Sequence, residues 1–174
     1  MGRKGRSGMG GGGGGKSSAQ QQYEAIHQFQ QVSWEGITPS DRSALRDFIN
    51  SNPDVTDQVT RGMVVSEDTI NRWIEGGEVN HQGMNSWTTG GSASDFSRVN
   101  RYVDADGGKR SVILISPKGM PNSAKLPRTN AYMENEVLTT TTKFKILSYR
   151  KQRPYSGSGN KSPYEIVITV KPVN

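Results

Sequence analysis

The sequence has no cysteine, only two histidines and few aromatic residues, which make up 7% of its 174 residues. Without cysteine there is no disulfide and no thiolate ligand, and two histidines alone do not complete a zinc site. No apolar run approaches the roughly 18 residues that a membrane-spanning helix needs, and the first residues lack the apolar stretch of a secretory signal. We therefore expect a cytoplasmic monomer that binds no metal and has no membrane partner.

Positive charge is concentrated at the start of the chain. Residues 1–22 hold four of the 22 Lys and Arg residues and none of the 16 acidic residues, so the rest carries 18 cations against 16 acids. Nine of the first 15 residues are glycine, and such a segment buries too little apolar surface to offset its backbone entropy. We predict a disordered basic tail at 1–22 and one domain at 23–174. Weak binding of the tail to nucleic-acid phosphates is one interpretation, and a solvated linker is the simpler one.

Helix signals come first in the domain and strand patterns come later. Thr38-Pro39-Ser40-Asp41 combines a capping residue, a proline suited to the first turn and a capping-box acid. Helical apolar spacing also marks Tyr23–Val32 and the segment after Ser66. Strands are predicted at Val59–Ser66, Ser86–Thr89, Arg101–Asp104, Ser111–Ser116, Glu134–Leu138, Lys143–Ser148 and Tyr164–Lys171. This order favours an α+β domain in which N-terminal helices pack on two β-sheets.

Two glutamates stand two residues apart in the segment Tyr132–Leu138. Side chains alternate along a strand, so Glu134 and Glu136 would face the same side. Two like charges this close resist joint ionisation unless cations or hydrogen-bond donors face them. The pair is therefore a candidate for chemistry, and two solvent-facing strand residues are the alternative.

Two earlier segments contain further residues of interest, and their order along the chain is informative. Arg61 lies in Thr60–Met63, and Ser86 opens the strand Ser86-Trp87-Thr88. Arginine, then a Ser-x-Thr strand, then Glu-x-Glu resembles the arginine–serine–glutamate class of mono-ADP-ribosyltransferases, which occur in bacterial toxins and in bacteriophage head and effector proteins. The resemblance implies an ADP-ribosyltransferase-like fold that uses NAD as co-substrate. It also implies transfer of ADP-ribose to a protein side chain with release of nicotinamide.

The resemblance assigns roles to individual residues. Glu136 would be the catalytic carboxylate that stabilises positive charge on the ribose, and Ser86 would orient it. Glu134 would act on the acceptor, and a glutamate there goes with arginine acceptors. Arg61 would contact the phosphates of NAD. The remaining NAD contacts implied are Gly62, Thr88 and Phe96, with plain core packing as the alternative for Phe96.

Two features lie outside this set of residues. The polar segment Lys118–Met133 is expected to be an exposed loop that recognises the acceptor. Trp87 replaces a small residue of the family's strand, so the match is partial there, and core packing is its expected role.

Two other interpretations stay open. One is a noncatalytic protein of the same fold, kept for binding, for instance as a virion component. The other is a basic nucleic-acid-binding protein that uses the tail and the stretch Lys143–Arg153, where tyrosines alternate with cations. Alternation at Lys143–Ile146 equally fits a strand with one solvated face. For the toxin or phage interpretation, the place of action would be the host-cell cytoplasm or the virion.

Overall fold

The computed structural model describes residues 17–32, 36–89, 109–129, 135–151 and 166–173. These ranges contain three helices and eight named strands. The helices are α1 (Ser18–Val32), α2 (Pro39–Asn50) and α3 (Glu67–Gly76). The strands are β2 (Val59–Ser66), β3 (Glu78–Asn80), β4 (Asn85–Thr89), β5 (Lys109–Ser116), β6 (Ser123–Lys125), β7 (Glu136–Thr139), β8 (Lys143–Lys151) and β9 (Ile166–Val173). The predicted α+β class is confirmed.

The helices begin where the sequence places a capping side chain. Thr38 and Asp41 form the predicted capping box at α2, and Ser66 caps α3 by accepting from the Thr69 amide. α1 begins at Ser18, earlier than predicted, because the Ser17 hydroxyl accepts from the Gln20 amide at 3.2 Å. The predicted disordered tail at 1–22 therefore extends too far, because residues 18–22 belong to α1.

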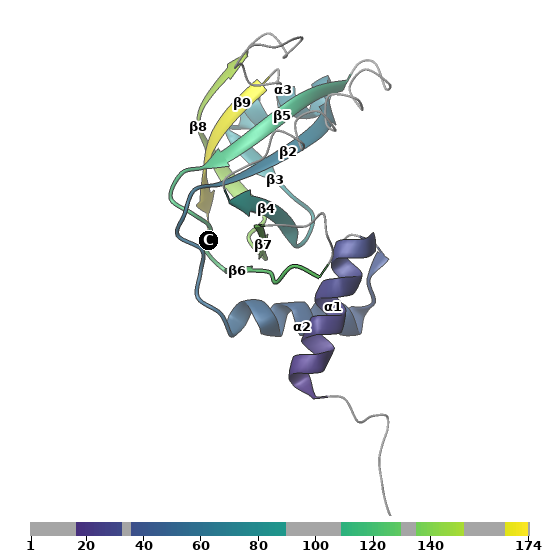
Figure 1. Ribbon diagram of the computed structural model, residues 1–174. Helices are drawn as coiled ribbons and strands as arrows, with labels where there is room; N and C mark the ends of the chain where they lie inside the picture. Colours follow the sequence, from purple (N-terminus) through teal and green to yellow (C-terminus); the bar gives the residue numbers. More distant parts are fainter. Residues whose placement is uncertain (1–16, 33–35, 90–108, 130–134, 152–165, 174) are drawn as a thin grey trace, which may run out of the picture.

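The described strands form one mixed sheet in the order β3-β8-β9-β5-β2-β4-β7-β6. β2 pairs with β5 along all eight of its residues but with β4 at only two, Val59 opposite Thr89 and Thr60 opposite Thr88. This short junction divides the sheet into a five-strand half, β3 to β2, and a three-strand half, β4 to β6 (Figure 1). The two sheets expected from the sequence are thus two halves of one hydrogen-bonded sheet.

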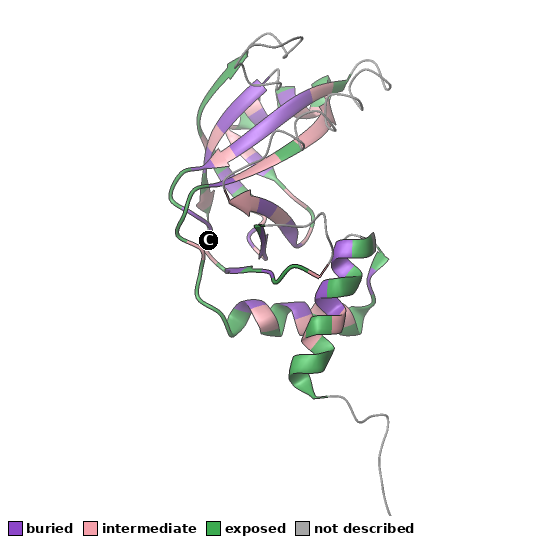
Figure 2. Cartoon of the chain, viewed as in Figure 1, coloured by how far each residue is buried: buried purple, intermediate pink, exposed green. Residues whose placement is uncertain are grey.

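The two larger apolar clusters of the described residues hold the fold together. The larger one lies between the two halves and α3, and it contains Trp87, Phe144 and Val137, each at most 1% exposed. The smaller one joins α1 and α2 to the three-strand half through Ile26, Leu45 and Leu138. Figure 2 shows that the buried residues of α1 gather toward its C-terminal half, which is the part that faces the strands.

The segment predicted as an exposed loop, Lys118–Met133, is partly a strand. Ser123–Lys125 forms β6, paired with β7, and Met120, Ala124 and Leu126 are buried. The polar composition of the segment had predicted exposure. Ser123 is nevertheless fully buried, and its hydroxyl donates to the Met120 carbonyl at 2.6 Å. A buried hydroxyl is tolerated when it has such a partner.

Two predicted segments fall outside the described ranges: the strand at Arg101–Asp104 and the end of the loop at residues 130–133. Among the helices that the structure describes, none is both long enough and apolar enough to cross a membrane.

Candidate active site

The pairing of β4 with β7 brings residues 50 positions apart in the sequence onto one face. Ser86 lies opposite Leu138, and Thr88 lies opposite Glu136. Directly paired residues of antiparallel strands project to the same side, so Ser86, Thr88 and Glu136 share a face. Trp87 points to the other side, where it is 1% exposed and its indole N–H donates to the Asn85 side chain at 2.6 Å. The prediction of core packing for Trp87 is confirmed.

Glu136 is a buried carboxylate, only 4% exposed, at the first position of β7. Burial raises its pKa above the ordinary value, because an ionised carboxylate loses hydration in the interior. Three neighbours act in the opposite direction and lower the pKa: hydrogen bonds from the side chains of Ser86 and Gln30, and the charge of Arg61. The group is therefore buried among contacts that favour its charged form.

Arg61 lies where the two halves of the sheet separate. Pairing of β2 with β4 stops at Thr60, and the next residue, Arg61, donates from Nη1 to the backbone carbonyl of Ser86 at 2.7 Å. The donors of a guanidinium lie in a fixed plane. This hydrogen bond therefore holds β4 beside β2 just past the last residue pair between the two strands. Arg61, Ser86 and Glu136, predicted as one group, are close together in the structure.

The strand that carries Glu136 begins later than predicted. β7 begins at Glu136, and Asn135 before it has φ 58° in the left-handed region, which asparagine tolerates better than most residues. The same-face argument requires an extended residue between the two acids, so it does not apply here. Glu134 itself lies outside the described residues.

The other predicted NAD contacts are placed as follows. Thr88 is half-buried on the face it shares with Glu136, and Gly62 is exposed on β2 opposite Ile113. Phe96 lies outside the described residues. The structure therefore brings Thr88 to the group and leaves Gly62 beside Arg61 on the neighbouring strand.

Sequence reasoning missed two residues near this group. Gln30 of α1 donates to the Glu136 carboxylate at 3.0 Å. His81, after β3, packs edge-on against Phe144 and Trp87 with ring centroids 5.5 and 6.5 Å apart. Burial, and then the charge of Arg61, lower the pKa of His81 to about 3. Only tertiary contacts distinguish these two residues, since neither has a motif around it.

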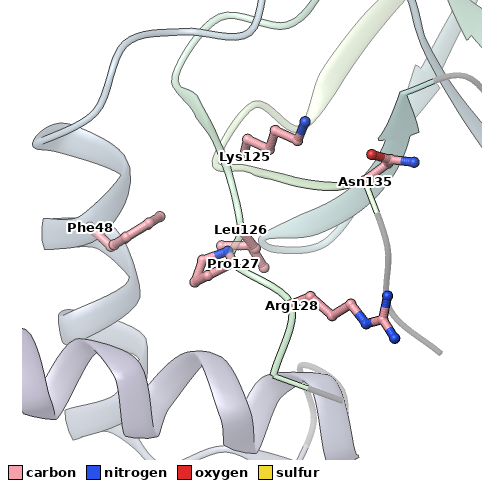
Figure 3. Close-up of a pocket in the computed structure, with 6 residues that line it drawn as sticks. All are labelled: Phe48, Lys125, Leu126, Pro127, Arg128 and Asn135. Atoms are coloured by element: carbon pink, nitrogen blue, oxygen red, sulfur yellow. The ribbon is translucent and has the colours of Figure 1, made fainter. Parts of the chain in front are cut away.

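A pocket of about 780 Å³ lies beside the start of β7. In Figure 3, Phe48 reaches from α2 toward Leu126 and Pro127, while Arg128 and Asn135 border the other side. Lys125 completes the lining, so both charged side chains in it are cationic. Among the residues that the structure describes, no cluster of His, Cys, Asp or Glu is arranged to hold a metal ion.

The basic stretch is an exposed strand. Lys143 and Lys145 of β8 are exposed and Phe144 between them is fully buried, as the alternation predicted. Farther along β8, Tyr149 is 49% exposed beside the exposed Arg150 and Lys151.

The chain has the fold of the ADP-ribosyltransferases, with a split mixed sheet and N-terminal helices. In this chain a buried glutamate lies at the start of β7. The ADP-ribosylating toxin BECa of a binary enterotoxin of Clostridium perfringens, solved with NADH, is similar with a TM-score of 0.52 and 14% identity, over 91% of this chain and 44% of that one. C3larvin, an ADP-ribosyltransferase toxin of Paenibacillus larvae, is similar with a TM-score of 0.51 and 14% identity, over 88% and 87%. At these identities the similarity establishes the fold. No protein-family model matches the sequence, and none of the curated proteins is similar to it in sequence.

Proposed function

We propose that the protein is an NAD-dependent mono-ADP-ribosyltransferase that modifies a protein side chain, with arginine as the acceptor. The observation that carries the proposal is the convergence of Arg61, Ser86 and Glu136 in a chain with the ADP-ribosyltransferase fold. Three separate strand segments contribute one residue each, and the carboxylate they surround is buried. A buried carboxylate kept among a cation and two hydrogen-bond donors is typical of a functional site.

The residues present suit the chemistry of this co-substrate. NAD supplies a glycosidic bond whose cleavage builds positive charge on the ribose, while the bond's electron pair leaves with nicotinamide. The Glu136 carboxylate stabilises that charge, and Ser86 and Gln30 hold the carboxylate in place. The charge of Arg61 acts on this carboxylate, and we propose that Arg61 also attracts the pyrophosphate.

The acceptor completes the reaction. A nitrogen of its guanidinium bonds to the ribose carbon and gives up a proton, for which a carboxylate base is required because guanidinium is otherwise always protonated. Glu134 is the proposed base, on the strength of the family resemblance. The bacteriophage association is likewise a proposal that rests on the resemblance.

The test is transfer of labelled ADP-ribose from NAD into proteins of a bacterial lysate. We expect wild-type protein to label a discrete band and Glu136→Gln to label none. Glu75→Gln removes an exposed glutamate of α3 and is the matched control, which should label like the wild type. Mapping the label to arginine would support the acceptor. Labelling by Glu136→Gln would contradict the proposal. So would the absence of labelling by folded wild-type protein.

A second candidate is nucleic-acid binding along β8. Exposed Lys145, Arg150 and Lys151 accompany the exposed Tyr149 on this strand, which suits phosphate contacts combined with base stacking. Salt-dependent binding to single-stranded DNA or RNA that persists in Glu136→Gln would favour this function.

A further inference from the structure

Gln30 lies in the last turns of α1 with only 8% of its surface exposed, and its side-chain amide uses its full bonding capacity. Nε2 donates to the Glu136 carboxylate at 3.0 Å and to the Pro127 carbonyl at 3.2 Å. Oε1 accepts from the Thr129 amide at 3.2 Å and from the Thr129 hydroxyl. An amide has two donors and two lone pairs, so all four positions are occupied.

The orientation of this amide is determined by its partners. The two groups on its nitrogen side, a carboxylate and a carbonyl, are acceptors, and the Thr129 N–H on its oxygen side is a donor. A flipped amide would face acceptors with its oxygen and a donor with its nitrogen, losing these bonds. Hydrogen-bond partners of this kind assign an amide's orientation, so Gln30 presents an N–H to Glu136.

We propose that Gln30 is a positioning residue that fixes the Glu136 carboxylate relative to α1 and to residues 127–129. The inference rests on the proposed function, in which Glu136 stabilises the ribose charge. Ser86 holds the carboxylate from β4, and Gln30 holds it from the helix layer, across 106 positions of sequence. A carboxylate held from two independent elements is preorganised, and preorganised groups lose nothing to rearrangement during the reaction.

The rival explanation is that Gln30 merely satisfies buried backbone groups of residues 127–129. That role involves Pro127 and Thr129 and makes no demand on Glu136. The two explanations differ in what happens to the carboxylate's ionisation. The groups that act on it are Gln30 from α1, Ser86 from β4 and the cation Arg61 from β2. Loss of the Gln30 donor would raise the Glu136 pKa, because the charged form loses a hydrogen bond.

The experiment compares Gln30→Met, which keeps the length of the side chain without its amide, with Gln28→Met on the exposed side of the same helix. Thr129→Val removes one contact of Gln30 and leaves its bond to Glu136. Two measurements are made on each: the pH profile of nicotinamide release from NAD, and the titration of the Glu136 carboxyl carbon by ¹³C NMR, assigned by its absence in Glu136→Gln.

For Gln30→Met we expect the acidic limb and the NMR midpoint to move to higher pH, and release on the alkaline plateau to fall about tenfold or more. Gln28→Met should match the wild type, and Thr129→Val should keep the wild-type midpoint. An unchanged midpoint in Gln30→Met would overturn the inference. If Gln30→Met does not fold, Gln30→Glu is used instead; placing a second carboxyl against Glu136, it should raise the midpoint further, and an unchanged midpoint there would also overturn it.

The two readouts separate this inference from the proposed function. If wild-type protein releases no nicotinamide but Gln30→Met shifts the NMR midpoint, the proposed enzymatic function is wrong and the contact of Gln30 with Glu136 is supported. Nicotinamide release by wild type with no shift in Gln30→Met would uphold the enzyme and refute the role of Gln30.

Discussion

At the scale of single residues, Glu136 combines a proposed catalytic role with a cost in stability. Its pKa is raised in the folded protein, chiefly by burial. Between the unfolded and folded pKa values, the folded state holds a proton that the unfolded state has lost. The stability that Glu136 contributes is therefore present below the unfolded pKa and is lost as the pH rises through the folded one.

Glu136→Gln should accordingly become more stable relative to the wild type as the pH is raised from 4.5 to 8. The measurement is the free energy of unfolding in urea at both pH values, with Glu75→Gln as control. A constant difference between Glu136→Gln and wild type would show that burial does not disfavour the charged carboxylate. Greater stability together with lost activity is a common trade-off at functional sites.

His81 has the opposite dependence. Its pKa is lowered to about 3 by burial and by Arg61, so between pH 6.5 and 3 the unfolded state takes up a proton that the folded state does not. Stability is fully present above the unfolded pKa and falls as the pH decreases, by up to about 1.4 kcal/mol per pH unit for one proton. His81→Phe keeps a ring against Trp87 and Phe144 and removes the titrating group.

We expect the loss of unfolding free energy between pH 7.5 and 5 to be smaller in His81→Phe than in the wild type. His27→Phe on the exposed side of α1 is the control for replacing a histidine elsewhere. Equal losses in wild type and His81→Phe would contradict a neutral, buried His81.

The sequence permitted a prediction of Arg61, Ser86 and Glu136 as a group only through the order of the motifs. Their proximity depends on how β4 pairs with β7 and where β2 leaves β4, and both are long-range features of the sheet. Gln30 and His81 could not be predicted, because glutamine and histidine on a helix or beside a strand are usually solvated. Burial and contacts alone reveal their roles.

At the scale of secondary-structure elements, the best predictions have a local chemical cause. The start of α2 followed from Thr38, Pro39 and Asp41, whose interactions lie within one turn. β7 begins at Glu136, later than predicted, because the left-handed backbone of Asn135 has no clear signal in the sequence. β6 was missed because its two buried residues, Ser123 and Ala124, are small and only weakly typical of strands.

Gly119 links the segment before β2 to the turn after β5, and its replacement tests that link. Its φ is +90°, and a Cβ there would lie 2.2 Å from the Val55 carbonyl oxygen. Gly119→Ala should therefore lose about 2–4 kcal/mol of unfolding free energy, since strain and steric overlap both contribute.

Gly76→Ala is the control, because a Cβ at the end of α3 has no neighbour within 4 Å. That variant should be neutral or slightly stabilised. Urea denaturation measures both variants, and equal stabilities of the two would contradict the close approach at Gly119.

At the scale of the whole molecule, the split of the sheet positions the proposed site. The five-strand half carries Arg61, the three-strand half carries Ser86 and Glu136, and the N-terminal helices supply Gln30 (Figure 1). The α+β class was predictable from the order of helix and strand patterns. The single sheet and its two-pair junction were not, because strand order depends on contacts between distant segments.

The most direct test of the central claim is nicotinamide release from NAD by the purified protein, with Glu136→Gln and Glu75→Gln measured beside the wild type. We predict release by wild type and Glu75→Gln, and a fall of about a hundredfold or more in Glu136→Gln, with all three folded by circular dichroism. Equal release by Glu136→Gln and wild type, or none from folded wild-type protein, would contradict the assignment of this site to NAD cleavage.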